Sequence, residues 1–401
     1  MKYLVVLGDG MADLPCAELG NFTPLECAHK PNMDSLAAAG RMGMVRTVTG
    51  GLPPGSDVAN LSVLGYDPSK FYTGRAPLEA VSMGVELNEN DVAFRCNLVT
   101  LSEADKYEKS VMVDYSAGEI MSDAAAILIK DFEKFLASDD MKFYPGISYR
   151  HLMVWRNGPA DTLLTPPHDI SGRGISEYLP AGNGGEALLS VMKRSNLFFR
   201  THHYNMSGKG VRPVSSVWFW GQGKSPSLPA FRDKFGLAGA VISAVDLLKG
   251  IGISAGMEVI EVDGATGNIH TNFSGKARAA AEAFRNGADL VYLHIEAPDE
   301  AGHQGNAGMK VKAIEEIDSK VLGPLLKWME EFGHFRVMVL PDHPTPLSLK
   351  THTSDPVPFV VYDSGNSTGG SEKRYCEKDA AGGFQIQQGH DLMDYFINGS
   401  F

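Results

Sequence analysis

Short apolar runs alternate with longer amphipathic segments along most of this chain. The runs are rich in Val, Ile and Leu, as buried strands are, and lie at 3–7, 239–243, 258–262, 289–295 and 336–340. Segments with helical spacing of apolar positions lie among them, at 32–40, 277–286 and 309–329. Regular alternation of strands and helices is typical of a parallel sheet and predicts an α/β core. In the last of these helices, the acidic residues Glu315, Glu316 and Asp318 are expected on a solvated face.

The pattern changes between about residues 90 and 195. This stretch is more charged, and 120–136 is its clearest amphipathic run. Two further strands are expected here, at 92–100 and 148–155. We therefore predict a smaller domain at 90–195, inserted into a core domain that is made of residues 1–89 and 196–401. A chain of 401 residues is long enough for two domains.

Composition and charge restrict the kinds of molecule that the protein is expected to bind. Apolar residues make up 43% of the chain, which is ordinary for a globular protein, and the formal net charge is −12. This charge argues against binding to nucleic acid or to an anionic membrane, but it permits a small anionic substrate in a local basic pocket. The apolar run at 3–7 is too short for a signal peptide. The four cysteines show no CxxC spacing, so we expect reduced thiols and a cytoplasmic protein.

Carboxylates and imidazoles follow three of the predicted strands. They are Asp9; Asp299 and His303; and Asp342, His343 and, nine residues further on, His352. Ligands of open α/β sheets bind at the carboxyl ends of the strands, so these side chains are expected at one edge. Such groups are ligands for ions such as Zn²⁺, Mn²⁺ or Fe. Their number is too large for one catalytic metal ion and suits two.

Ser56 lies between a Gly/Pro-rich loop, 50–55, and a segment with helical spacing. Two interpretations are open at this point. Serine is favoured as a helix N-cap, because its oxygen accepts a hydrogen bond from a helix N–H group. A serine beside free N–H groups could also be a nucleophile that receives a phosphate. Asp299 is open to the same question, since it follows Pro298 at the start of a helical turn.

A set of motifs resembles the archaeal-type, cofactor-independent phosphoglycerate mutases of the alkaline phosphatase superfamily. The motifs span nearly the whole chain: Gly8-Asp9-Gly10, Pro54-Gly55-Ser56-Asp57 with Asn60, Phe94-Arg95-Cys96-Asn97, Pro298-Asp299-Glu300-Ala301-Gly302-His303, Asp342-His343-Pro344-Thr345-Pro346 and His352-Thr353-Ser354-Asp355-Pro356. The resemblance implies a three-layer α/β core with a mostly parallel sheet and an inserted α+β lid domain. It also implies that 3-phosphoglycerate and 2-phosphoglycerate are interconverted through a phosphoserine.

The resemblance further implies a role for each site residue. Ser56 would be the nucleophile. Asp9, Ser56, Asp342 and His343 would hold one divalent ion, and Asp299, His303 and His352 a second. Mn²⁺ is the expected ion, with Zn²⁺, Mg²⁺ or Co²⁺ as alternatives. The expected contacts to the small phosphorylated substrate are Arg75, Arg95, Arg150, His168, Arg173 and Lys276.

One stretch departs from the family pattern. Archaeal members typically show Asp-Arg-Arg-Ala-Gly-Arg-Ile in the lid, whereas residues 114–120 read Asp-Tyr-Ser-Ala-Gly-Glu-Ile. Cations are lost and an acid, Glu119, is gained. This variant resembles a bacterial branch proposed to act as a homoserine kinase in threonine synthesis, and a plain phosphatase is a further alternative. Residues 221–225 do not form a P-loop, because Trp218 stands where that motif needs Gly.

Overall fold

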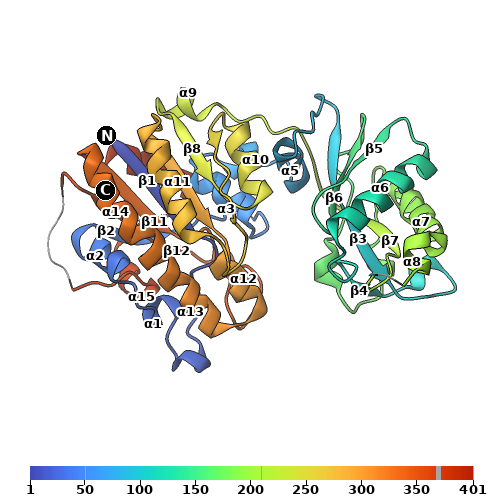
Figure 1. Ribbon diagram of the computed structural model, residues 1–401, viewed down its shortest axis with the longest axis horizontal. Coiled ribbons are helices and arrows are strands. Elements are labelled where there is room, and N and C mark those ends of the chain that lie inside the picture. Colours follow the sequence, from blue (N-terminus) through green and yellow to red (C-terminus); the bar gives the residue numbers. More distant parts are fainter. Residues whose placement is uncertain (50, 209, 367–371, 401) are drawn as a thin grey trace. The chain divides into compact units, whose positions relative to one another are not determined.

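The computed structural model describes residues 1–49, 51–208, 210–366 and 372–400. The chain divides into two compact units. The core unit comprises Met1–Tyr72 and Ser227–Phe401, and the inserted unit comprises Thr73–Pro226. Both termini therefore belong to the core unit (Figure 1). None of the helices in the described ranges is long and apolar enough to cross a membrane.

The core unit is built on an eight-stranded, mainly parallel sheet. Its strands, in spatial order, are β13 (Phe384–Ile386), β2 (Arg41–Val45), β12 (Val357–Asp363), β11 (Phe335–Leu340), β1 (Lys2–Gly8), β10 (Leu290–Ile295), β8 (Gly239–Ile242) and β9 (Glu258–Val259). β1 lies in the middle and is parallel to both β10 and β11. β12 pairs antiparallel with both of its neighbours. The predicted α/β class with a mainly parallel sheet is thereby confirmed.

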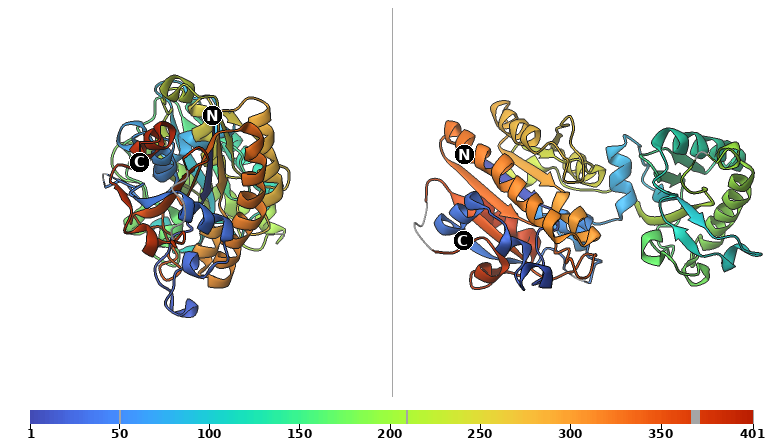
Figure 2. Two further views of the ribbon diagram at one scale, coloured as in Figure 1. Left: turned by 90° about the vertical axis from the view of Figure 1, so that its left-hand side faces the viewer. Right: turned by 60° about the horizontal axis from the view of Figure 1, so that its bottom comes forward.

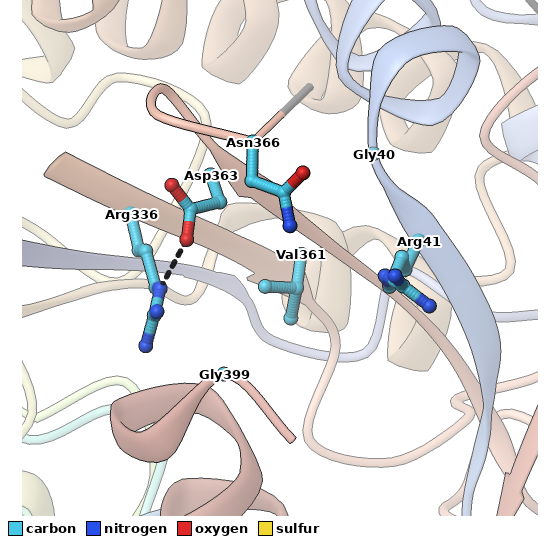
Figure 3. Close-up of a pocket in the computed structure, with 7 residues that line it drawn as sticks. All are labelled: Gly40, Arg41, Arg336, Val361, Asp363, Asn366 and Gly399. Atoms are coloured by element: carbon cyan, nitrogen blue, oxygen red, sulfur yellow. Dashed lines mark hydrogen bonds and ion pairs between the residues drawn. The ribbon is translucent and has the colours of Figure 1, made fainter. Parts of the chain in front are cut away.

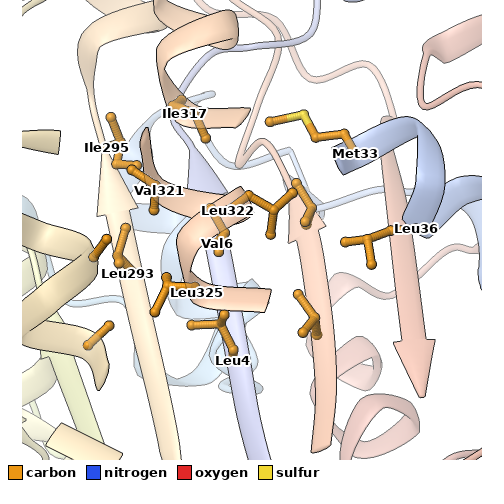
Figure 4. Packing of buried hydrophobic residues seen from close by; sticks show 14 of the residues in the cluster. Leu4, Val6, Met33, Leu36, Leu293, Ile295, Ile317, Val321, Leu322 and Leu325 are labelled. Atoms are coloured by element: carbon orange, nitrogen blue, oxygen red, sulfur yellow. The ribbon is translucent and has the colours of Figure 1, made fainter. Parts of the chain in front are cut away.

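Helices cover one face of this sheet in a continuous apolar layer. The helices in this layer are α2 (Pro31–Ala39), α11 (Phe273–Arg285), α13 (Ala307–Glu316) and α14 (Gly323–Met329). Leu4 and Val6 of β1 and Leu293 of β10 point into this layer, where they pack against residues such as Leu322 and Leu325 (Figure 4). The turned views show α11, α13 and α14, in gold to orange, against the strands (Figure 2). The burial of these side chains is the main source of the unit's stability.

The other face of the sheet carries the alternate residues of the same strands. Tyr3 packs its ring on Phe396 of α16 (Leu392–Asn398), and Tyr292 donates a hydrogen bond to Asn60 of α3 (Ser56–Val63). Successive side chains of a strand point to opposite faces, so these contacts place α3 and α16 opposite the α11–α14 layer. The remaining helices of the core unit are α1 (Pro24–Cys27), α4 (Pro68–Phe71), α9 (Phe231–Phe235), α10 (Asp246–Ser254), α12 (Ala297–Gln304) and α15 (Glu377–Ala380).

The long helix predicted at 309–329 contains a π-helical segment, Ile317–Leu322, between α13 and α14. The prediction that Asp318 faces solvent is wrong, because this residue is fully buried. Its carboxylate accepts hydrogen bonds from the backbone N–H groups of Asn32 and Met33, at 3.2 and 2.7 Å. These are unpaired donors at the start of α2, and a carboxylate is favourable beside a helix N-terminus.

The inserted unit contains a five-stranded antiparallel sheet with helices packed against it. Its strands are β3 (Val92–Leu101), β4 (Met112–Asp114), β5 (Met141–Tyr144), β6 (Arg150–Trp155) and β7 (Ser216–Lys224). Its helices are α5 (Arg75–Ser82), α6 (Ser122–Leu136), α7 (Gly185–Thr201) and α8 (His203–Met206).

The inserted unit extends beyond the predicted bounds of 90 and 195. β7 pairs with β3 along nearly its whole length, so residues 216–224, which the predicted bounds place in the core, complete the second sheet. α5 contributes Ala76 and Ala80 to an apolar cluster with Ala93 of β3, so it belongs to the same unit. The pairing of β7 with β3 joins residues more than a hundred positions apart, so it leaves no local signal at the carboxyl-terminal boundary of the unit.

Candidate metal centre and nucleophile

Three neighbouring parallel strands place the predicted ligands at one edge of the core sheet. Asp9 follows β1, and Asp342 and His343 follow β11. Asp299 and His303 lie four residues apart on α12, which begins where β10 ends. All three strands run in the same direction, so their carboxyl ends lie side by side.

These side chains form two groups that share one histidine. Asp9, Asp342 and His343 form the first group, and Asp299, His343 and His352 form the second. Within each group the potential ligand atoms lie within 4.8 Å of one another. His303 joins the second group, because its Nε2 lies 3.2 Å from a carboxylate oxygen of Asp299. The site therefore has residues suited to hold divalent metal ions.

Ser56 lies beside the first group. Its Oγ is 3.1 Å from Nε2 of His343 and 3.5 Å from Oδ2 of Asp9. Ser56 is the first residue of α3, while Gly55 is the N-cap, and no side-chain capping hydrogen bond forms there. Asp299 is also not an N-cap, since Glu296 occupies that position of α12. The capping interpretation therefore does not apply to either residue.

The hydrogen bonds of two histidines orient their free ring nitrogens toward each other. Nδ1 of His303 lies 3.0 Å from the carbonyl oxygen of Lys350, and Nδ1 of His352 lies 3.4 Å from that of Pro54. A carbonyl only accepts, so each Nδ1 carries a proton, and each Nε2 presents a lone pair when its ring is neutral. The two Nε2 atoms are only 2.9 Å apart. Two facing lone pairs repel unless a proton or a cation lies between them, so the geometry fits a metal ion.

The charges around these residues also fit a cation. Burial raises the pKa of Asp9 well above its ordinary value, and the nearby carboxylates of Asp342 and Asp299 raise it further. Oδ1 of Asp9 is buried and has no hydrogen-bond partner among the described residues. Although burial opposes the shift, His303 and His352 hold the pKa of Asp299 well below its usual range when their Nε2 atoms carry protons and donate to its carboxylate. A divalent ion would neutralise this concentration of carboxylates and satisfy the unpaired oxygen.

Several residues that hold these ligands were not predicted from the sequence. Nδ2 of Asn60 donates to Oδ2 of Asp342 at 2.9 Å and to the carbonyl of Ser56 at 2.8 Å. Oδ1 of Asn60 in turn accepts a hydrogen bond from the buried Tyr292 hydroxyl, at 2.6 Å. Asn60 thus connects the candidate nucleophile to a candidate ligand. Its presence in a matched motif was the available signal, but nothing in the motif indicates these partners.

His294 is the second unpredicted residue. It is fully buried, its Nε2 lies 2.9 Å from Oδ2 of Asp9, and its Nδ1 lies 3.1 Å from Oγ of Ser243. Burial lowers its pKa to about 3, so the ring is neutral and orients Asp9 by a hydrogen bond. The only signal in the sequence is a polar residue at an alternate position of an otherwise apolar strand.

Lys276, a predicted substrate contact, is also buried in the core unit. Its Nζ donates a hydrogen bond to the carbonyl of His294 at 3.0 Å. Burial lowers the pKa of Lys276 to about 8. The lysine therefore supports the strand that carries His294, and its contact with substrate stays a prediction.

The structure brings four other predicted contacts into one region of the inserted unit. Nε of Arg75 and Nε of Arg95 each lie 3.1 Å from a different oxygen of Glu79. The guanidinium of Arg95 also stacks 4.4 Å from the Trp220 ring, against which His168 packs at 5.1 Å. Burial lowers the pKa of Arg95 to about 10, which leaves it charged at neutral pH.

Arg150 of β6 lies opposite Asn97 of the neighbouring strand β3, and the guanidinium of Arg150 is 5.3 Å from the Tyr149 ring. The ring of Tyr115, from the stretch that departs from the family pattern, packs on Tyr149 at 5.7 Å. An aromatic side chain therefore stands at a position where the resemblance to archaeal members implies a cation. Arg173 is exposed, and its Nη1 donates a hydrogen bond to the Tyr178 hydroxyl at 3.4 Å, outside this group.

A separate pocket lies at the amino end of β11. Its lining residues are Gly40, Arg41, Arg336, Val361, Asp363, Asn366 and Gly399 (Figure 3). Arg336 is paired there with Asp363, with Nε 2.7 Å from Oδ2. Asp342 and His343 follow the other end of the same strand, so this pocket is not part of the candidate metal centre.

The fold and the site together define a class: α/β proteins with a serine beside a candidate divalent-metal centre at the carboxyl edge of a mainly parallel sheet. A family profile described as 2,3-bisphosphoglycerate-independent phosphoglycerate mutase matches residues 37–205. A Methanosarcina mazei protein of that name is 51% identical over 402 residues, which cover 99% of this chain and 100% of the relative. A Geobacter sulfurreducens protein, named as a probable member, is 52% identical over 401 residues, which cover 99% of this chain and 100% of the relative. The chain belongs to the 2,3-bisphosphoglycerate-independent phosphoglycerate mutase family.

Solved structures agree with this assignment. A Pyrococcus horikoshii protein superposes with a TM-score of 0.80 at 29% identity, over 99% of this chain and 96% of the other. The cofactor-independent phosphoglycerate mutase from Thermoplasma acidophilum superposes with a TM-score of 0.65 at 25% identity, over the full length of both chains.

Proposed function

We propose that this protein interconverts 3-phosphoglycerate and 2-phosphoglycerate through a phosphoserine at Ser56. Family membership supports the reaction. The observation that carries the proposed mechanism is the position of Ser56 Oγ, 3.1 Å from His343 Nε2 and 3.5 Å from Asp9 Oδ2. A hydroxyl at this point can be deprotonated and can attack a phosphoryl group at the edge of the sheet.

Asp9, Ser56, Asp342 and His343 would hold one divalent ion, and Asp299, His303 and His352 the other. Mn²⁺ is the ion that we propose, with Zn²⁺, Mg²⁺ and Co²⁺ as alternatives. When bound, such ions lower the pKa of a coordinated hydroxyl and offset the charge of phosphoryl oxygens. The donor set supports the pair, because it forms two groups with separate carboxylates that have only His343 in common.

In the first half-reaction Ser56 Oγ forms a bond to phosphorus while the bond from phosphorus to the 3-oxygen of glycerate breaks. The proton given up by Ser56 ends on that 3-oxygen. In the second half-reaction the 2-oxygen of the retained glycerate attacks the phosphoserine, and its proton returns to Ser56. Glycerate must stay bound and water must stay out, because hydrolysis of phosphoserine would make the protein a phosphatase.

We propose that Arg75, Arg95, Arg150 and His168 of the inserted unit retain the anionic organic part of the substrate, as the resemblance to the family's lid implies. Guanidinium groups bind carboxylates and phosphates well, since they offer paired donors in one plane. Glu79 and Trp220 support this role, because they hold the guanidinium of Arg95 in one orientation. A cytoplasmic location is part of the proposal and agrees with the four free cysteines.

The test is ³¹P NMR of the Mn²⁺-loaded protein in two samples, one with 3-phosphoglycerate and one with ATP and homoserine. A 2-phosphoglycerate signal in the first sample is the expected result. We expect Ser56→Ala to reduce this rate by at least about 10³-fold, because the covalent route is lost. Ser62→Ala is the matched control, since Ser62 is a buried serine of the same helix whose hydroxyl has no hydrogen-bond partner among the described residues.

Other products would change the assignment. Phosphohomoserine in the second sample, with no product in the first, would reassign the acceptor to homoserine. Tyr115 and Glu119 are a specific reason to test this outcome, because they belong to the stretch that departs from the family pattern. Inorganic phosphate alone in the first sample would identify a phosphatase. Full mutase activity in Ser56→Ala would refute the phosphoserine mechanism.

A further inference from the structure

The hydroxyl of Thr345 lies between residues of the two candidate metal groups. Thr345 is fully buried, and its Oγ1 makes a short hydrogen bond to Oδ1 of Asp299. The same oxygen lies 3.3 Å from Nδ1 of His343. Asp299 belongs to the second group, whereas His343 is shared by both. A single hydroxyl therefore contacts a candidate ligand on each side of the centre.

The direction of these hydrogen bonds determines the tautomer of His343. A carboxylate has no proton to donate, so the single proton of the Thr345 hydroxyl points to Asp299. Oγ1 must then act as the acceptor for His343, which places a proton on Nδ1 of the ring. In the part of the chain that the structure describes, Nδ1 of His343 has no other hydrogen-bond partner. Nε2 is left with a lone pair, and it faces Ser56 Oγ at 3.1 Å.

The backbone of Thr345 is held rigidly enough to keep its hydroxyl in this position. Nζ of Lys310 donates to the Thr345 carbonyl at 2.8 Å and pairs with Asp13 at 2.6 Å. The N–H of Thr345 donates to the carbonyl of Ala12 at 3.2 Å. Both charged groups of the Lys310–Asp13 pair are buried, so breaking the pair would leave an uncompensated charge.

Gly10 leaves the space that this arrangement needs. A Cβ at Gly10 would come within 2.6 Å of Thr345 Oγ1 and 2.7 Å of Asp299 Oδ1. The φ of Gly10 is +63°, a conformation that other residues rarely adopt. The glycine that directly follows Asp9 therefore allows Asp299 and Thr345 to approach the first strand.

We propose that Thr345 is a positioning residue that couples the two metal groups of this site. Its hydroxyl accepts a hydrogen bond from Nδ1 of His343 and donates one to Asp299, and so links the two residues. The chain selects the ring tautomer in which Nε2 can bind a cation, and at the same time it orients the carboxylate of the second group. The ligands of both groups are thus oriented for metal binding together, and loss of the hydroxyl weakens metal binding by both groups. This inference rests on the proposed metal centre.

The test compares Mn²⁺ binding by the chelator-treated full chain and by three variants, using electron paramagnetic resonance to count free Mn²⁺. Thr345→Val removes the hydroxyl at similar volume, and we expect Mn²⁺ affinity to fall about 10–100-fold at both sites, as for other residues that orient metal ligands. Thr345→Ser keeps the hydroxyl, and we expect it to stay within about threefold of the unchanged protein. Thr100→Val is the matched control, because it removes one buried hydroxyl hydrogen bond, to Pro213, in the other unit.

Each outcome is decisive. Unchanged affinity in Thr345→Val overturns the proposal, and so does a loss at only one site, since the hydroxyl would then not couple the groups. Thr345→Ser as weak as Thr345→Val also overturns it, because a merely structural defect would not be rescued by the hydroxyl. An unchanged protein that binds no Mn²⁺ refutes the proposed function itself, which separates that failure from the failure of this inference.

A second measurement needs no variant and is independent of folding defects. Histidine-selective ¹⁵N NMR of the metal-free protein reports which ring nitrogen of His343 carries the proton. We expect a proton on Nδ1 and an unprotonated Nε2. A proton on Nε2 in the metal-free protein overturns the proposal.

Discussion

Asn60→Asp is a sharp test of how the candidate centre is held, because it exchanges one NH₂ group for an oxygen without changing the shape of the side chain. Nδ2 of Asn60 donates to Asp342 Oδ2 at 2.9 Å and to the carbonyl of Ser56 at 2.8 Å, and the residue is fully buried. In the variant both contacts become contacts between acceptors. A second carboxylate would also face Asp342 at hydrogen-bond distance, where no proton separates them.

The magnitude follows from these contacts. Losing hydrogen bonds to buried acceptors costs about 1–3 kcal/mol. An unpaired charge introduced into a buried network raises the cost, and we expect about 3–5 kcal/mol in the metal-free protein. For a unit of this size, each kcal/mol lowers Tm by about 2–4 °C, so the expected decrease is about 6–20 °C. Mn²⁺ should reduce the deficit, since a cation offsets the added charge.

Asn205→Asp provides the matched control in the inserted unit. Nδ2 of Asn205 also donates to two carbonyls, those of Phe199 and Val214, at 2.8 and 2.7 Å, but no candidate metal ligand is among its partners. We would measure both variants by differential scanning calorimetry after chelation. If Asn60→Asp destabilised its unit no more than Asn205→Asp does, the carboxylate of Asp342 would not face Asn60 as described, and the reasoning would be refuted.

Two further predictions concern the inserted unit. His151 is buried, accepts the N–H of Gly146 on Nδ1 at 3.0 Å, and has its pKa lowered to about 3 by burial, so only the unfolded chain takes up its proton near pH 6.5. The free energy of unfolding should therefore fall by about 2 kcal/mol from pH 8 to pH 5 on account of this group. We expect His151→Leu to flatten this pH dependence, measured by urea titrations. The control, His203→Leu, changes a histidine at an exposed position and should leave the pH dependence unchanged. Glu79→Gln should raise KM for phosphoglycerate about tenfold with a smaller change in kcat, because the guanidinium of Arg95 loses its charged anchor. A lower KM would instead show that the negative charge of Glu79 merely opposes the substrate.

The amino-acid sequence alone determined the class of fold and the edge at which the candidate residues meet. Apolar runs of strand length, each followed by a helical segment, encode a parallel sheet locally, since burial on both faces requires such runs. Asp9, Asp299 and Asp342 could be placed together because each follows a strand of that sheet, and parallel strands end at a common edge. Neither step needs knowledge of which strands are neighbours.

Only the tertiary structure decided how those residues are held. The tautomers of His303, His343 and His352 depend on partners such as the carbonyl of Pro54 and the hydroxyl of Thr345, which no local pattern reveals. The same is true of β7, which joins the inserted sheet by pairing with a strand more than a hundred residues away. Hydrogen bonds have strict distance and direction, and their long-range partners are brought together only when the whole chain packs. A sequence pattern records which face a residue occupies, whereas the partner on that face is a property of the folded chain.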